Sequence, residues 1–156
     1  MDTGTSHAFE TTLGGDTLSR MLTQASLTHD IVMIFCGLAS VEKHLARVQA
    51  RVAVGGHDIP RHKVQERWDT SRANLIRLLP VLTRLQVFDN SAEAAPGEDI
   101  PDPVLLLEMI QGRITFPTGK DLARWKATPG WAKPILQAAV EISPSGRSSP
   151  GRNRSS

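Results

Sequence analysis

The stretch IVMIFCGL, residues 31–38, is the part of the sequence that decides the fold class. The run is continuous, apolar, rich in branched and aromatic side chains, and too short for a helix, so it predicts a β-strand. An apolar strand without polar alternation is typical of a parallel sheet that helices cover on both faces. We therefore expect an α/β fold with this strand buried on both faces, and Cys36 as a small core residue rather than a nucleophile.

Two helical patterns and a second apolar strand follow this run. Ser40 predicts the start of the first helix, and Gly55-Gly56 predicts its end. Pro60 fits the first turn of the next helix, which we expect to stop near Pro80. LQVFDNS, residues 85–91, predicts another buried strand. The order strand, helix, helix, strand is an α/β pattern.

The flanking segments predict smaller elements. Upstream, residues 6–12 predict a short strand or strand end, and Asp16 predicts the N-cap of a helix over 17–27. Downstream we expect, in order, a loop over 92–103, a short helix over 104–111, a brief strand or turn in GRITFP, and helices in DLARWKA and WAKPILQAAVEI. The domain is expected to occupy residues 1–142, followed by a disordered tail over 143–156.

Composition and charge limit the possible function classes. A chain of 17.0 kDa with 40% hydrophobic residues is long enough for one domain with a core. The predicted tail carries Arg147, Arg152 and Arg154 and no acid, so removing it changes the net charge from +2 (18 basic against 16 acidic) to −1 (15 against 16). Because the basic excess belongs to the tail, the composition argues against a nucleic-acid-binding face on the domain.

The cysteine and histidine content predicts neither a disulfide nor a metal site. Cys36 is the only cysteine, which excludes an internal disulfide and fits a reducing, cytoplasmic compartment. His57-Asp58 and His62 match no usual zinc spacing, so we assign no metal-binding side chains. No signal peptide or membrane-spanning stretch is visible, and we expect no membrane partner.

The segment GGHDIP, residues 55–60, predicts a mobile connection between the two helices. Paired glycines relax the backbone while Pro60 stiffens the far side, so the helices resemble a hairpin that closes over a ligand. Arg47, Arg51 and Arg67 would then bind phosphate oxygens, because a guanidinium stays charged and binds them bidentately. The other interpretation is an ordinary helical hairpin with solvated arginines, and the spacing alone favours it.

Two polar segments are further candidates. Glu10, with Thr11 beside it, would accept hydrogen bonds from substrate hydroxyls if it ends a strand, although an exposed loop acid is the simpler interpretation. Asp89 and Asn90 follow a predicted strand where α/β sheets place ligand-binding loops, and they are equally good turn formers. The P-loop pattern G-x-x-x-x-G-K-[ST] is absent, because Asp121 follows Gly119-Lys120 and Ile114 holds the upstream glycine position.

Several of these motifs together resemble a known family. AFETTLGG, IVMIFCGLASVEKHLARVQARV, GGHDIPRHKVQERWDTSRANL and VFDNS, in that order, resemble the zeta toxin family of bacterial P-loop kinases over about residues 7–91, and GWAKPIL is similar to the end of such proteins. The resemblance implies a partial P-loop kinase-like fold with a parallel sheet, flanking helices and a helical-hairpin lid. It also implies ATP with Mg²⁺, transfer of a phosphoryl group to a sugar hydroxyl such as that of a UDP-amino sugar, and an antitoxin partner.

The resemblance also implies roles for individual residues. Glu10 and Thr11 would face the substrate, and Arg51 and Arg67 would be the catalytic lid cations. Asp89 and Asn90, together with Arg47 of the first hairpin helix, would lie near the nucleotide.

The sequence departs from the family pattern in three respects. The aromatic residue that follows the lid arginine is here a tryptophan, Trp68, which is a mild change from the family pattern. Thr70 stands where relatives often carry a basic residue. The P-loop and the strand with the general base are absent, so we expect this chain to be catalytically inactive, with exposed sheet edges that favour pairing. The alternative is a non-catalytic remnant that binds a nucleotide or a protein.

Overall fold

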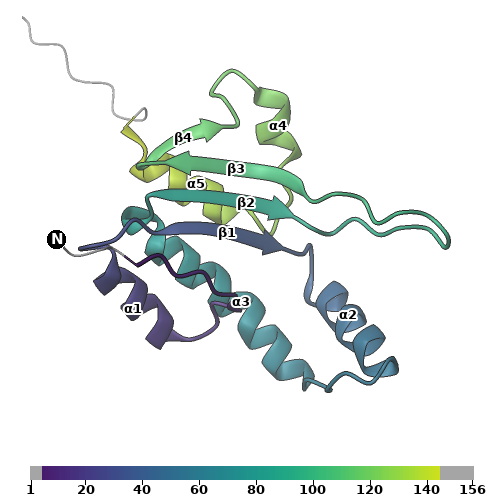
Figure 1. The fold of residues 1–156 in the computed structure, drawn as a ribbon. Coiled ribbons are helices and arrows are strands. Elements are labelled where there is room, and N and C mark those ends of the chain that lie inside the picture. Colours follow the sequence, from purple (N-terminus) through teal and green to yellow (C-terminus); the bar gives the residue numbers. More distant parts are fainter. Residues whose placement is uncertain (1–4, 145–156) are drawn as a thin grey trace, which may run out of the picture.

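The sheet contains four strands in the order β1-β2-β3-β4, and the computed structural model describes the chain over residues 5–144. Figure 1 shows α3 and α5 together on one side of this sheet. The elements are α1 (Asp16–Ala25), β1 (Val32–Gly37), α2 (Val41–Ala53), α3 (Arg61–Leu78), the 3₁₀ turn η1 (Leu79–Val81), β2 (Arg84–Asp89), β3 (Val104–Ile110), β4 (Arg113–Phe116), α4 (Leu122–Ala127) and α5 (Lys133–Ile142). The mixed α/β class expected from the sequence is confirmed.

Only one pair of strands is parallel. β1 and β2 run parallel, with Val32 opposite Arg84 and Gly37 opposite Asp89, and α2 and α3 supply the crossover that a parallel pair requires. β3 and β4 join antiparallel to their neighbours, so the expectation of a parallel sheet holds for β1 and β2 alone.

The expected helix over 104–111 is wrong, because these residues form β3. Gln111 and Gly112 both have positive φ angles, 49° and 73°, which is the backbone of a two-residue hairpin turn. This turn returns the chain as β4, and β3 gains a hydrogen-bonded partner on each side. Leucine-rich runs suit helices by local propensity, and here long-range pairing prevails over that preference.

The helices cover only one face of the sheet. Leu85, Val87 and Leu107 are buried between the sheet and the helices. On β1, by contrast, Val32 and Ile34 are 63% and 65% exposed. The expectation that this strand is buried on both faces is therefore wrong, and so is the expectation of a buried Cys36, which is exposed. We call the uncovered side the bare face.

The helix boundaries agree with the sequence signals at α2 and α3. Ser40 accepts a hydrogen bond from the backbone N–H of Lys43 at 3.3 Å, which is an N-cap contact. Gly55, with φ of +94°, follows the end of α2, and Pro60 directly precedes α3. Ser40 and the glycine pair therefore mark the ends of α2 as predicted, whereas Pro60, expected in the first turn of α3, lies one residue before it.

The expectations upstream of α1 are wrong. Residues 6–12 form no strand and are exposed. Gly15, not Asp16, occupies the N-cap of α1, and Asp16 lies in the first turn, where its carboxylate pairs with Arg77 of α3 at 3.1 Å. A carboxylate is stabilised at the positive end of a helix both at the N-cap and in the first turn. An aspartate in the sequence therefore does not distinguish these two adjacent positions.

The end of the domain lies one residue beyond the boundary that the sequence predicts. Ser143 is buried beside the end of α5, where its N–H donates to the carbonyl of Ala139 at 3.0 Å. In the rest of the expected disordered tail, Pro144 is exposed and residues 145–156 lie outside the described residues. Within residues 5–144, no helix combines the length and apolar character needed to cross a bilayer.

Candidate functional site

Polar side chains gather where β1 and β2 end. Because the two strands are parallel, their carboxyl ends lie at the same edge of the sheet, and α2 starts beside them. The residues involved, which we call the strand-end cluster, are Lys43, Arg47, Asp89, Asn90, Ser91 and Glu93. Three of them, Arg47, Asp89 and Asn90, are the nucleotide-binding residues expected from the sequence.

Hydrogen bonds hold the strand-end cluster together. The Nη2 atom of Arg47 donates to the backbone carbonyl of Asn90 at 2.6 Å, and the N–H of Asn90 donates to the carbonyl of Gly37 at 2.9 Å. The hydroxyl of Ser91 donates to the carboxylate of Asp89 and accepts from the N–H of Ala39 at 2.7 Å. The structure therefore brings Arg47, Asp89 and Asn90 together and fixes the first helix of the hairpin to the strand ends.

Sequence reasoning missed three residues of this neighbourhood, namely Lys43, Glu93 and His44. Lys43 binds the carboxylate of Glu93 at 2.6 Å, and this hydrogen bond and charge lower the pKa of Glu93. His44 is half-buried, and its pKa is lowered first by burial and then by the charge of Arg47. Lys43 and Glu93 are fifty residues apart, so no local pattern connects them.

Arg51 and Arg67 differ from Arg47 in their contacts. Both side chains are exposed, and neither forms an ion pair with an acid in the described part of the chain. The stem of Arg67 packs beside Gly14, where an added Cβ would lie 3.2 Å from its Cγ atom. Two arginine head groups on the hairpin are therefore free to bind an anion.

The proposed substrate residues lie apart from the strand-end cluster. The hydroxyl of Thr11 accepts a hydrogen bond from the N–H of Leu13 at 3.0 Å, which makes Thr11 part of a local turn. Glu10 is exposed, and its carboxylate has no hydrogen-bond or ion-pair partner within residues 5–144. The segment that contains Glu10 and Thr11 lies against α3, because Gly14 contacts Arg67. No hydrogen bond between described residues joins Glu10 or Thr11 to Asp89 or Asn90.

A second contact joins the hairpin to the sheet. Trp68 of α3 donates from its indole N–H to the carbonyl of Leu38 at 3.3 Å, just beyond β1. The guanidinium of Arg72 lies 3.6 Å from the centre of the Trp68 ring and donates to the Trp68 carbonyl at 2.9 Å. From the sequence, Trp68 was identified as the aromatic residue after Arg67, and no role was assigned to Arg72. The spacing of four residues between Trp68 and Arg72, one helical turn, is the signal that could have found their contact.

The pocket at this end of the sheet is small. Its volume is about 30 Å³, which is room for little more than one water molecule. It is lined by Phe35, Cys36, Gly37, Leu38, His44, Trp68, Ser71, Arg72 and Trp131. A nucleotide therefore fits here only on the open surface between the hairpin and the strand ends, or after the hairpin moves.

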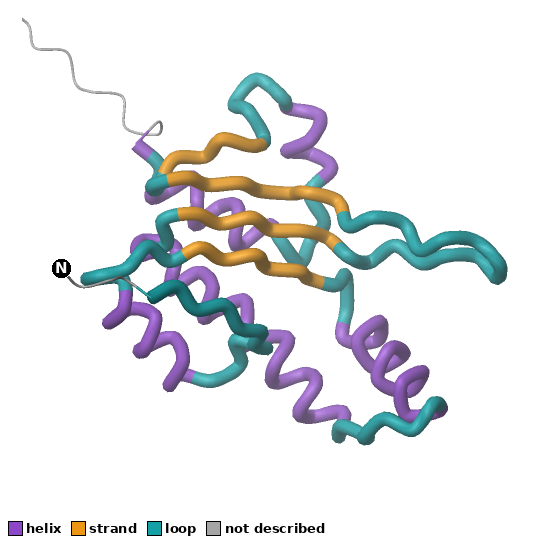
Figure 2. The backbone as a smooth tube through the Cα atoms, in the orientation of Figure 1, coloured by secondary structure: helices purple, strands orange, loops and turns teal. Residues whose placement is uncertain are grey.

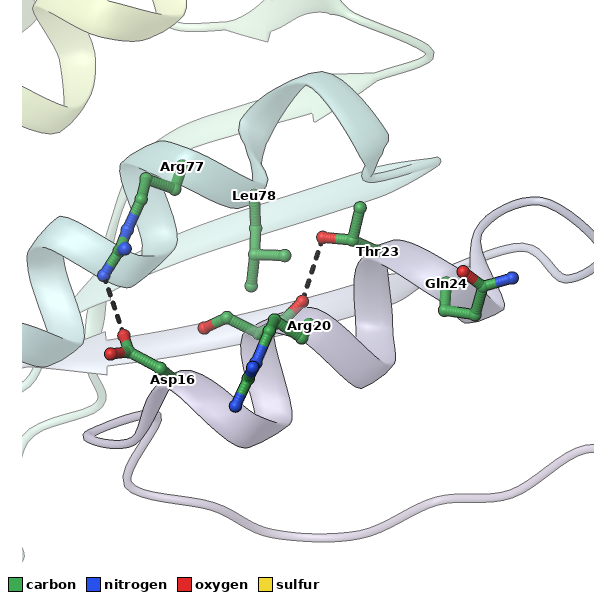
Figure 3. Close-up of a pocket in the computed structure, with 7 residues that line it drawn as sticks. Asp16, Arg20, Thr23, Gln24, Arg77 and Leu78 are labelled. Atoms are coloured by element: carbon green, nitrogen blue, oxygen red, sulfur yellow. Dashed lines mark hydrogen bonds and ion pairs between the residues drawn. The ribbon is translucent and has the colours of Figure 1, made fainter.

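A larger pocket lies elsewhere, between α1 and the end of α3 (Figure 3). Its volume is about 630 Å³, and it is lined by Asp16, Ser19, Arg20, Thr23, Gln24, Arg77 and Leu78. Figure 3 shows Arg77 turned toward Asp16, with which it pairs, whereas Arg20 projects away from Arg77. The polar groups do not converge on one point, and none of the site residues expected from the sequence lines this pocket.

The described residues contain no grouped metal ligands, and the chain matches no known family. Among residues 5–144, no three His, Cys, Asp or Glu side chains group closely enough to hold a metal ion. Comparison with models of known protein families, with curated proteins and with solved structures gives no match to this chain.

Proposed function

We propose that the chain binds the phosphates of a nucleotide or sugar nucleotide with its α2–α3 hairpin, as the lid portion of a zeta-toxin-like phosphotransferase. The observation that carries the proposal is the contrast among the hairpin arginines. Arg47 is bound to the strand ends, while Arg51 and Arg67 have no acidic partner among the described residues. An anchored hairpin with unpaired guanidinium groups is suited to bind phosphate oxygens.

Each candidate residue has a distinct role in this proposal. Arg47 holds α2 against the loop that follows β2, and it is therefore a positioning residue. Arg51 and Arg67 bind phosphate oxygens, and Asp89 and Asn90 lie beside the nucleotide. Glu10 and Thr11 accept hydrogen bonds from hydroxyls of the acceptor sugar.

The chain by itself is proposed to transfer no phosphoryl group. The sequence contains no phosphate-binding glycine loop, and arginine contacts raise the rate by about 10³ to 10⁵ only when the nucleotide is already seated. The residues present also do not fit Mg²⁺: Asp89 is bound by Ser91, Glu93 is bound by Lys43, and no third carboxylate lies with them in the described part of the chain. No step of the mechanism is routed through the ion.

The proposal is tested by titrating the isotopically labelled chain with ATP and with a UDP-amino sugar in NMR experiments. We expect shifts of resonances at the hairpin and the strand ends. Arg51→Ala and Arg67→Ala should each weaken binding about fivefold, since each removes one exposed charge-assisted contact. Arg113→Ala, which removes an exposed arginine of β4, is the matched control and should bind normally.

Two results would contradict this proposal. Equal binding by the hairpin variants and by the control variant would show that the arginines do not bind phosphate. Phosphorylation of the UDP-amino sugar by the pure chain would show that the proposed lack of transfer is wrong.

A second candidate function is a non-catalytic, protein-binding module. The observation that favours it is the position of β1 at the edge of the sheet, with exposed apolar side chains on the bare face. An edge strand of this kind is a template for pairing with another polypeptide strand.

A further inference from the structure

The backbone of β1 presents unpaired groups to the open edge of the sheet. The carbonyls of Ile31 and Gly37 accept hydrogen bonds from the β2 side. Because the backbone groups of successive strand residues alternate in direction, those of Val32, Ile34 and Cys36 point away from β2. No described backbone hydrogen bond connects residues 6–12 to β1, although Figure 2 shows this coil segment passing below the strand.

The two edges of the sheet differ in how they are protected. The edge formed by β4 is four residues long, begins with Arg113 and ends before Pro117, and all three features discourage further pairing. The edge formed by β1 is six residues long and contains neither a charge nor a proline. It also exposes Val32 and Ile34 on the bare face. Within residues 5–144, β4 is therefore the edge whose own strand carries features that discourage pairing, whereas β1 is flanked by the coil of residues 6–12 without a described backbone hydrogen bond to it (Figure 2).

We infer that β1 pairs antiparallel with β1 of a second copy of this chain, with Ile34 on the two-fold axis. The inference rests on the second candidate function and names its partner. In this register Val32 lies opposite Cys36 of the other copy, and the two Ile34 residues lie opposite each other. Three such pairs, each exchanging two hydrogen bonds, give about six new hydrogen bonds. The result is one continuous sheet through a closed, isologous interface.

Charge and side-chain chemistry favour a second copy as the occupant. The strand is uncharged, so two copies meet without repulsion along its length. Two-fold pairing places Asp30 of one copy near Leu38 of the other, and the two Asp30 carboxylates are kept at opposite ends. The exposed Val32 and Ile34 side chains meet apolar side chains across the axis, which removes apolar surface from water on both copies.

A cysteine substitution tests this register directly. Residues of a hydrogen-bonded antiparallel pair have Cα atoms about 5.5 Å apart, which is within the range for a disulfide. Val32→Cys should therefore form a covalent dimer with the native Cys36 under mild oxidation. A bond within one chain is impossible, because four strand residues span about 13 Å. The readout is the fraction of dimer on a non-reducing gel at equal protein concentration.

Two controls separate the proposed register from random oxidation. Val32→Cys combined with Cys36→Ser should lose the covalent dimer, because the new cysteine then faces a serine. Val54→Cys, at an exposed position beyond α2, should give little dimer. A covalent dimer that persists in the double variant, or one that forms equally with Val54→Cys, would overturn the inference.

Sedimentation and hydrogen exchange distinguish the failure of this inference from the failure of the protein-binding function. The unmodified chain should sediment as a dimer with slowly exchanging Ile34 amide groups, and Ile34→Lys should weaken the dimer at least about tenfold by placing two charges on the axis. A monomer with fast exchange at Ile34 would refute the second copy and leave the edge open to another protein. A monomer with slow exchange would refute both, since the chain would then cover its own edge.

Discussion

The two hydrophobic clusters of the molecule differ in size and in what they hold together. The larger one lies between the sheet and the helices α3 and α5 and includes the fully buried Leu75, Leu107 and Ile135. The smaller one joins α2 to α3 and contains three buried residues, Val41, Val48 and Val64. Trp68 packs against both clusters. The difference indicates that the sheet with α3 and α5 is the stable base, and that α2 contributes less apolar packing to the fold, with Trp68 at the junction.

The largest effect is expected from a cavity in the larger cluster. Leu107→Ala removes a fully buried side chain from the centre of the sheet, and such changes cost about 2–5 kcal/mol of unfolding free energy. Since domains are stable by only about 5–15 kcal/mol, this is a large share of the total. Urea denaturation followed by circular dichroism measures the loss.

A matched control lies two residues away. Leu105→Ala is the same substitution in the same strand, at a half-buried position outside the larger cluster. We expect it to cost less than about 1 kcal/mol. If both variants lost the same stability, the larger cluster would not be the base of the fold.

The features that depend on neighbouring residues in the sequence were predicted, and the features that depend on contacts between distant segments were missed. Ser40, Pro60 and the glycine pair at 55–56 act on the backbone next to them in the sequence, so the ends of α2 and α3 were predicted closely. The strand β3 was missed because its identity depends on pairing with β2 and β4. The exposure of Ile34 was missed because an apolar run does not reveal whether one or two faces are covered.

The candidate site also contains residues that the sequence could predict and contacts that it could not. Arg47, Asp89 and Asn90 were predictable because parallel strands bring their carboxyl ends to one edge, where polar turn residues collect. The contact between Lys43 and Glu93 depends on the path of the loop after β2, and the hydrogen bond from the Trp68 indole to the carbonyl of Leu38 depends on the packing of α3 against that edge. The functions of Arg51, Arg67, Glu10 and Thr11 stay predictions until ligand binding is measured.

A smaller and local effect is expected in the hairpin. Val48→Ala removes two methyl groups, worth about 1.6 kcal/mol, from the smaller cluster, and the better helix propensity of alanine returns about 0.5 kcal/mol. The net cost of about 1 kcal/mol should appear as faster hydrogen exchange in α2 and the first half of α3. Exchange in β2 and β3 should stay the same if the base is independent. Equal acceleration in the sheet would show that the two clusters unfold as one unit.

The smallest effect is a dependence of stability on pH that comes from His44. Burial and the charge of Arg47 lower the pKa of His44 below its usual value of 6.5, so the folded chain keeps this imidazole neutral where the unfolded chain protonates it. The contribution of His44 is therefore fully present above about pH 6.5 and is lost as the pH falls from there through the folded pKa. The stability advantage of the unmodified chain over His44→Gln should shrink between pH 7.5 and pH 5.5. Gln49→Ala, an exposed change on the same helix, should show no such trend in urea denaturation. A constant difference between the unmodified chain and His44→Gln would mean that His44 is as well solvated in the folded hairpin as in the unfolded chain.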